Sequence, residues 1–115
     1  MQSNPTRVPN PAELTDDLFD ALSDTYRRTV LTTLVQSPET TFDEVCATLT
    51  DRINADTEYV GTVLYHTQLP YLAAREFIDY SMETRQIRQG PEFQTILPLL
   101  RLVGSARETL QISWP

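Results

Sequence analysis

Four side chains between residues 59 and 66 could recognise a polar partner, because they fall on one side of a predicted helix. At about 100° of rotation per residue, the two sides of this helix are distinct. The side expected to be free carries Tyr59, Thr62, Tyr65 and His66, and the side expected to pack carries Val60, Val63, Leu64 and Thr67. Hydroxyl, imidazole and aromatic edges of this kind can meet base edges or phosphates of double-stranded DNA. Packing of Tyr65 and His66 against a neighbouring helix or a partner chain is the alternative.

Two arginines further along the chain, Arg85 and Arg88, suit contacts with DNA phosphates or with a narrow minor groove. The reason is that guanidinium is a long and permanently charged fork. The alternative is a solvated pair that balances the charges of Asp79 and Glu83.

Catalysis and metal binding are not expected from this sequence. It has one cysteine, one histidine and three glycines, so it lacks clustered metal ligands and a Gly-rich phosphate-binding loop. Cys46 lies on an apolar stripe with Val45 and Leu49, where a cysteine usually serves as a small core side chain. We expect no enzyme activity, no cofactor and no small-molecule ligand.

The charge composition is unusual. All nine basic residues are arginine, and with sixteen acidic residues they give a formal net charge of −7. An acidic surface without lysine is typical of proteins from extreme halophiles, where molar salt screens charge repulsion over very short distances. An acidic mesophilic protein is the alternative. Between residues 57 and 74 the only basic side chain is His66, which is the main argument against DNA binding.

The chain divides into three predicted parts. Residues 1–13 are polar, contain prolines and have no apolar periodicity, so they are expected to form a disordered arm. Residues 14–90 form the folded domain, and residues 91–115 form a C-terminal dimerisation helix and tail. A chain of 115 residues fits one domain, and it has neither a long apolar segment nor a signal region. We therefore expect a cytoplasmic protein that does not enter the membrane.

Capping patterns set the starts of the first three predicted helices. Thr15 is expected to cap the first helix, Ser23 or Asp24 the second and Thr41 the third. The second helix ends near Gln36, ahead of a Ser-Pro pair. The residues expected to face the core are Leu18, Phe19 and Leu22, then Val30, Leu31 and Leu34, then Phe42, Val45, Cys46 and Leu49.

A polar loop over residues 50–55 leads to a fourth helix, which Asp56 caps and which runs to about residue 75. Pro70 cannot donate a hydrogen bond to the carbonyl of His66, so a kink is expected there. The kink also explains Leu69 and Leu72, which need a change of helical phase to reach the core. Two short strands, residues 77–80 and 86–88, follow as a hairpin around a turn at 81–84.

The last segment, residues 91–110, is predicted to be a helix that is continuous or restarts at Pro98. Its apolar stripe exceeds what a small core can cover, which favours a homodimer built on Leu97, Leu100 and Val103. The alternative is that the stripe folds back on its own domain.

This order of elements predicts a fold that is mainly α with a small β-hairpin. It is the order of a winged helix-turn-helix of the α+β class, here with a C-terminal helix, and the hairpin is the wing.

Several segments resemble known winged-helix regulators. Residues 18–24, with Arg27 and Arg28, are similar to the opening of ArsR-like proteins. Residues 64–72, 77–80 and 83–88 resemble a haloarchaeal winged-helix family of unknown function, related to ArsR, in which a Leu-Pro-x-Leu helix runs into an Asp-Tyr…Glu-Thr-Arg wing. The third helix offers only Cys46 and no Cys-x-Cys motif, so metal sensing of the ArsR kind is not expected.

The resemblance implies a homodimeric, DNA-binding transcriptional regulator. Its recognition helices would enter successive major grooves, and its wings would touch the flanking backbone. The alternative is a winged-helix module that binds another protein and has lost DNA binding.

Overall fold

The computed structural model describes the backbone of residues 11–110 and the side chains of residues 16–104. Its helices are α1 (Pro11–Leu22), α2 (Thr25–Gln36), α3 (Phe42–Ile53), α4 (Thr57–Val63), the π-helical turn η1 (Leu64–Gln68), α5 (Leu69–Ala74) and α6 (Phe93–Leu110). Its strands are β1 (Glu39–Thr41), β2 (Ile78–Ser81) and β3 (Gln86–Gln89). The arrangement is winged-helix-like and of the α+β class, as predicted.

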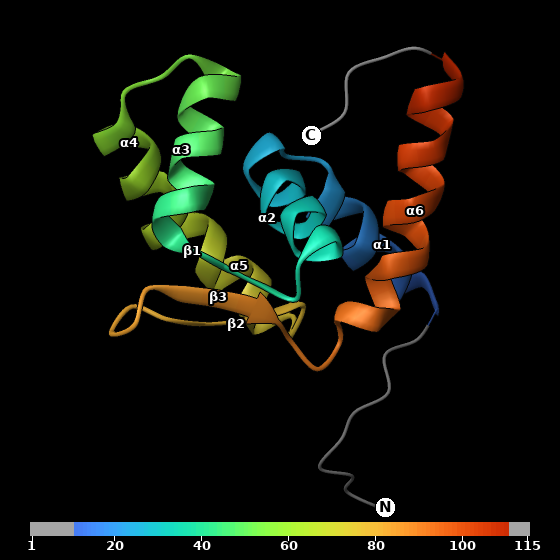
Figure 1. The fold of residues 1–115 in the computed structure, drawn as a ribbon. Coiled ribbons are helices and arrows are strands. Elements are labelled where there is room, and N and C mark those ends of the chain that lie inside the picture. The colour runs from blue at the N-terminus through green and yellow to red at the C-terminus, as the bar shows by residue number, and fades with distance from the viewer. Residues whose placement is uncertain (1–10, 111–115) are drawn as a thin grey trace, which may run out of the picture.

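Helix α2 is the centre of the fold. Asp24 caps it, because the Asp24 carboxylate accepts hydrogen bonds from the amides of the next turn. Its inward residues Val30, Leu31 and Leu34 are fully buried, as predicted. Figure 1 shows α3 and α4 on one side of α2, and α1 and α6 on the other.

The start of α1 differs from the prediction. The helix begins at Pro11 rather than after Thr15, because a proline at the first helical position loses no helical hydrogen bond. Residues 11–13 therefore belong to a helix, while the rest of the predicted arm lies outside the described residues. Phe19 was expected to pack with Leu18 and Leu22, but 57% of its surface is exposed.

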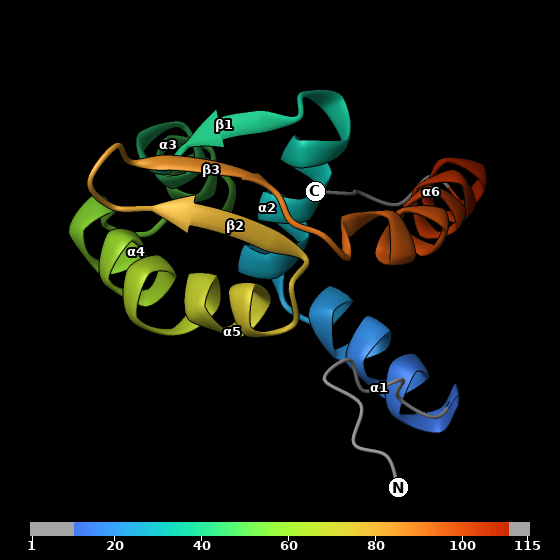
Figure 2. The same ribbon diagram turned by 90° about the horizontal axis from the view of Figure 1, so that it is seen from below.

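Strand β1 turns the predicted hairpin into a three-stranded antiparallel sheet with the order β1-β3-β2 (Figure 2). Ile87 of the central strand lies opposite Thr40 of β1 and Tyr80 of β2, and it is buried. Strand β1 was not predicted, since its three residues, a glutamate and two threonines, carry no apolar alternation. The hairpin strands each lie within one residue of their predicted bounds.

Helices α3 and α4 are joined by a tight turn. Thr41 caps α3 by accepting the Glu44 amide, and the four predicted inward residues of α3 are buried. The helix then continues to Ile53, so the loop predicted from residue 50 is too long. Asn54 ends it with φ of 53°, a left-handed conformation that asparagine tolerates. Only residues 54–56 separate the two helices, and this is the spacing of a helix-turn-helix.

The predicted fourth helix exists, and the irregularity expected at Pro70 takes the form of a π-helical turn. The helix widens into η1, where the amide of Leu69 donates to the carbonyl of Leu64, five residues earlier. The turn therefore holds one residue more than an α-helical turn. In an unbroken α-helix Leu69 would lie about 180° from Val60, at about 100° per residue. With the extra residue, Val60, Leu64, Leu69 and Leu72 are all fully buried, so the predicted change of phase is confirmed.

Helix α6 packs its apolar stripe onto its own domain. Phe93, Ile96 and Leu100 are buried in the core, and the helix continues through Pro98. Leu100 was expected to contact a second copy, but it is 3% exposed within the protomer. Leu97 and Val103 are half-buried against the same core.

Gly90 joins the sheet to α6 at a point of close backbone approach. Its amide donates to the carbonyl of Phe77, and its carbonyl accepts from the amide of Phe93. A Cβ atom at position 90 would lie 2.5 Å from the carbonyl oxygen of Glu76 and 2.8 Å from the amide nitrogen of Ile78. Glu76 itself has φ of 64° and accepts from the amide of Glu92. The start of α6 is therefore bound to the start of β2.

We predict that Gly90→Ala lowers the free energy of unfolding by about 1 to 3 kcal/mol, because the new methyl group meets backbone atoms that cannot move aside. Urea denaturation in high salt measures the change. Gly61→Ala is the matched control. A Cβ atom there would lie 3.8 Å from the ring of Phe42, an ordinary contact, so this helical substitution should stabilise by about 0.5 to 1 kcal/mol. Equal effects of the two substitutions would contradict the close approach at Gly90.

Candidate nucleic-acid interface

The predicted recognition face of α4 and η1 is exposed. Tyr59 is 60% exposed and Tyr65 is 42% exposed, and Thr62 and His66 are exposed beside them. The rings of Tyr65 and His66 meet edge to face, with centroids 4.7 Å apart. The alternative in which Tyr65 and His66 pack against a neighbouring helix is therefore wrong for this protomer. One inward assignment is also wrong, since Thr67 is exposed and Gln68 is buried in its place.

A shallow open hollow of about 380 Å³ joins this face to the hairpin. Its walls are Phe42, Gly61, Thr62, Tyr65, His66, Met82 and Arg85. The structure thus brings together four of the predicted residues, Thr62, Tyr65, His66 and Arg85. Tyr59 and Arg88 do not line the hollow. Phe42 and Met82 were not predicted, because Phe42 appears only as a core residue of its own helix and Met82 only as a turn residue.

Arg85 is bound to the first turn of α3. Its Nη2 lies 2.7 Å from Oδ1 of Asp43, its Nε donates to Oδ2 at 3.1 Å, and its guanidinium lies 4.8 Å from the ring centre of Phe42. The backbone carbonyl of Arg85, held at φ of 60°, accepts from the amide of Phe42. Its partner in the protein is therefore Asp43, and not Asp79 or Glu83, which the alternative to phosphate binding had named. The hydrogen bond from Arg85 lowers the pKa of Asp43.

Arg88 lies on the exposed side of the sheet, away from the hollow. In the strand register it stands opposite Glu39 of β1 and Asp79 of β2. Opposite charges in such cross-strand positions attract each other. The predicted balance with Asp79 therefore agrees with the register, and the two hairpin arginines face different surroundings.

Cys46 is 5% exposed, in the core with Phe42, Val45 and Leu49. Burial raises the pKa of its thiol, so the reactive thiolate is disfavoured. Its predicted place in the core is confirmed.

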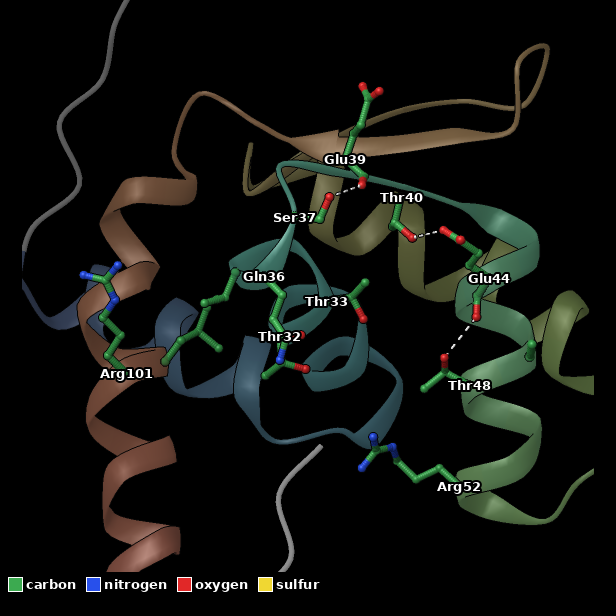
Figure 3. A pocket seen from close by; sticks show the side chains of 13 residues that line it. Thr32, Thr33, Gln36, Ser37, Glu39, Thr40, Glu44, Thr48, Arg52 and Arg101 are labelled. Atoms are coloured by element: carbon green, nitrogen blue, oxygen red, sulfur yellow. Dashed lines mark hydrogen bonds between the residues drawn. The ribbon is translucent and has the colours of Figure 1, made fainter.

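A larger open groove of about 740 Å³ lies between α2, β1, α3 and α6 (Figure 3). Its hydroxyl groups are used within the protein. Thr32 and Thr33 donate to helical carbonyls at 2.8 and 2.7 Å, and Thr40 donates to Oε1 of Glu44 at 2.9 Å. Of the predicted site residues, only Leu100 lines this groove.

In the described part of the chain, no helix has the length and apolar character needed to cross a bilayer. The same residues contain no group of three His, Cys, Asp or Glu side chains placed to hold a metal ion.

Comparison with protein families gives one match, over residues 19–88, to a domain of unknown function (DUF7344). The match covers more than half of the chain. The chain belongs to the DUF7344 family. Comparison with curated proteins and with solved structures finds no match. The family region runs from α1 to β3, so it contains the α3–α4 turn, the exposed helix face and the hairpin, and it ends before α6. The predicted resemblance to a family of unknown function over residues 18–88 is confirmed to that extent.

We predict that Arg85→Gln raises the pKa of Asp43 toward the ordinary value of an aspartate. In the wild type the lowered pKa means that the Arg85–Asp43 pair contributes fully to the stability of the fold at pH values above the ordinary pKa of an aspartate. This contribution is lost as the pH falls through the lowered pKa. An NMR titration of the Asp43 carboxyl measures both values. Arg88→Gln removes the same charge from the same hairpin and should leave Asp43 unchanged. A titration of Asp43 that is identical in all three proteins would rule out the pair in solution.

Proposed function

We propose that this DUF7344 protein is a DNA-binding transcriptional regulator of the winged helix-turn-helix type that acts as a homodimer in a halophilic cell. One observation carries the proposal. The second helix of the α3–α4 pair exposes Tyr59, Thr62, Tyr65 and His66 beside a hairpin that carries arginine.

The dimensions of DNA support this use of α4. The major groove is about 12 Å wide and admits one α-helix. In a helix-turn-helix the second helix lies in that groove, with its N-terminal residues on base edges, while the first helix crosses the backbone. Tyr59 and Thr62 are in the first two turns of α4, and both are exposed. The Thr62 hydroxyl donates to the carbonyl of Glu58, and its oxygen can still accept from a base.

To bind DNA in this way, Arg85 would have to leave its ion pair with Asp43 and pair with a phosphate instead. The exchange is feasible because both partners are solvent-exposed, with side-chain exposures of 46% for Arg85 and 70% for Asp43. An exposed ion pair is weakened by salt, and at about 1 M salt charges are screened beyond about 3 Å. A halophilic setting therefore favours the release of Arg85 from Asp43.

The acidity of the protein also fits a salt-dependent mechanism. DNA-binding proteins usually lose affinity as salt rises, because each neutralised phosphate releases a condensed cation. Here the exposed carboxylates Asp56 and Glu58 flank the start of the recognition helix. Cations held between such carboxylates and the phosphates would be taken up on binding, which opposes the usual loss.

The homodimer in this proposal uses the outer side of α6. Because Leu100 belongs to the core, the contact would be built on the exposed Leu102, together with the uncovered parts of Leu97 and Val103. Leu102 is 66% exposed, more than any other large apolar side chain among the described residues.

We predict that selection from a random duplex library in molar KCl recovers a preferred DNA site for the wild-type protein. Thr62→Ala and His66→Ala should lose about 1 to 3 kcal/mol of the preference for that site, because they remove base contacts. Arg85→Gln and Arg88→Gln should weaken binding to all sequences alike. Fluorescence anisotropy measures both quantities.

Matched controls lie on α6, where Arg101 and Gln94 are exposed. Arg101→Gln and Gln94→Ala should leave affinity and preference unchanged. From moderate to molar KCl the affinity should fall less steeply than for ordinary DNA-binding proteins, or should rise. A steep ordinary decline would contradict the cation mechanism. The absence of specific binding at every salt concentration would favour the second candidate, a protein-binding module, which the acidic start of α4 also supports.

We predict that Leu102→Glu converts the homodimer into a folded monomer, because it places a charge on the proposed contact. Sedimentation in high salt measures the mass. Leu100→Glu should instead unfold the protein, since it buries a carboxylate in the core. A wild-type protein that sediments as a monomer would refute this contact.

A further inference from the structure

Gln68 is a polar side chain in the core at the end of η1. It is 6% exposed and lies between Leu64 and Leu69, which are fully buried. A buried amide is costly unless it is hydrogen-bonded. Its partner is Arg27 of α2, whose Nη1 donates to Oε1 of Gln68 at 2.9 Å. This bond joins the recognition helix to a helix 41 residues earlier in the chain.

Arg27 is itself held in a fixed place by the junction of α1 and α2. Its Nη2 and Nε donate to the carbonyl of Asp20 at 2.8 and 3.2 Å, and Nη2 also lies 3.2 Å from the hydroxyl of Ser23. Four contacts of one rigid, planar guanidinium leave it little freedom to follow a moving partner. The Arg27 guanidinium is therefore held in place by the α1–α2 junction, and Gln68 is hydrogen-bonded to it.

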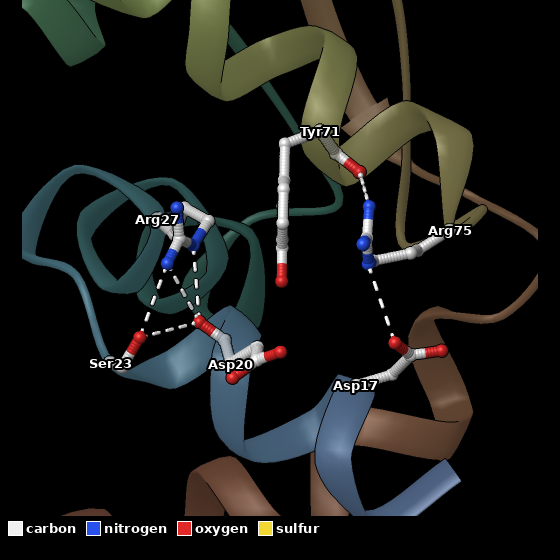
Figure 4. Close-up of polar contacts among 6 residues, drawn as sticks. All are labelled: Asp17, Asp20, Ser23, Arg27, Tyr71 and Arg75. Carbon is white, nitrogen blue, oxygen red and sulfur yellow. Dashed lines mark hydrogen bonds and ion pairs between the residues drawn. The ribbon is translucent and has the colours of Figure 1, made fainter. Parts of the chain in front are cut away.

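Tyr71 extends the same junction by one helical turn. Arg27 lies 4.3 Å from one face of its ring and Arg75 lies 3.7 Å from the ring on the other side (Figure 4). Arg75 in turn pairs with Asp17 of α1 at 3.6 Å and donates to the carbonyl of Tyr71. The start of α5 is thus fixed against α1 and α2 on both sides of one aromatic ring.

The position of Gln68 determines where the recognition side chains point. Gln68 belongs to the same π-helical turn as Tyr65 and His66. If this turn became α-helical, the segment before it would rotate relative to α5 by about 100°, the angle of one residue. Thr62, Tyr65 and His66 share one side of the helix at α-helical spacing, so they would turn together, away from Met82 and Arg85 of the hairpin. A bond that fixes Gln68 in the π-helical arrangement therefore also fixes this face against the hairpin.

We propose that Arg27 and Gln68 are positioning residues for the recognition face: their hydrogen bond holds η1 in its widened form and so keeps Thr62, Tyr65 and His66 turned toward the hairpin. The part of this inference that concerns DNA rests on the proposed function. The part that concerns the placement of the face does not, because the hollow that Tyr65 and His66 share with Arg85 is a property of the free protein.

The test uses the full chain with Gln68→Met, which keeps the size of the side chain but removes the acceptor. Gln68→Glu keeps an acceptor oxygen for Arg27 and is the rescuing variant. Thr67→Ala, at an exposed position of the same turn, is the matched control. NMR shifts of the His66 ring protons report on their surroundings in the hollow, which include the ring of Phe42, and DNA binding is measured on the site selected for the wild type.

We expect Gln68→Met to move the His66 ring shifts and to reduce the preference for the selected site by about tenfold, the size of one lost base contact. Binding to unrelated DNA should stay the same. Gln68→Glu and Thr67→Ala should retain both wild-type properties. A change confined to thermal stability, with ring shifts and preference intact, would overturn the proposal, because a merely structural bond predicts that result.

Two further variants keep the test decisive. If Gln68→Met does not fold, Gln68→Asn retains the amide but is one methylene too short to reach Arg27, and the same shifts are measured. Arg27→Met should reproduce the His66 ring shifts of Gln68→Met. The double variant should show the same shifts as either single variant, because each substitution removes the same hydrogen bond. Additive shifts would overturn the proposal. If the wild type binds no DNA, the proposed function fails, and the His66 shifts still decide the positioning role.

Discussion

The missing amide hydrogen of Pro70 constrains the whole recognition helix. Without a donor to the carbonyl of His66, a regular α-helix would leave one carbonyl unpaired and would turn Leu69 away from the core. The widened turn η1 resolves the second problem by adding one residue, so that Leu69 and Leu72 join Val60 in the interior. The same rotation decides which side chains remain outside. Core packing and the composition of the exposed face are therefore two results of one change in hydrogen bonding.

Local signals in the sequence predicted much of this architecture. Capping residues such as Asp24, Thr41 and Asp56 identified helix starts, because a cap acts within three residues of the chain. The apolar stripes of α2 and α3 were also correct. Pro70 indicated an irregularity in the helix, but the form of that irregularity was not predictable. A bend of the helix and a π-helical turn can each accommodate a residue that has no amide donor.

Interactions between distant residues escaped prediction. Strand β1 exists because β3 offers it an edge, and its own three residues show no strand pattern. The partner of Arg85 lies 42 residues away, while acidic residues much closer in sequence were the natural expectation. Leu100 was assigned to a dimer contact, and its burial in the core was not predicted. The reason is that the sequence does not show how many apolar side chains are needed to cover α2. The exposed face at residues 59–66 was found because helical periodicity alone defines it.

The separation of α6 from the exposed face of α4 has a consequence for the DNA site that the proposed homodimer would bind. Helix α2 lies between α6 and α4, so that the two are on opposite sides of the protomer (Figure 1). Two copies joined through α6 would place their α4 helices at the outer ends of the dimer, related by a two-fold axis. An operator that suits them would be an inverted repeat, with half-sites spaced by whole turns of the double helix, about 34 to 36 Å each. The bases at the centre would be spanned without being touched, and they would matter only through the stiffness of the duplex.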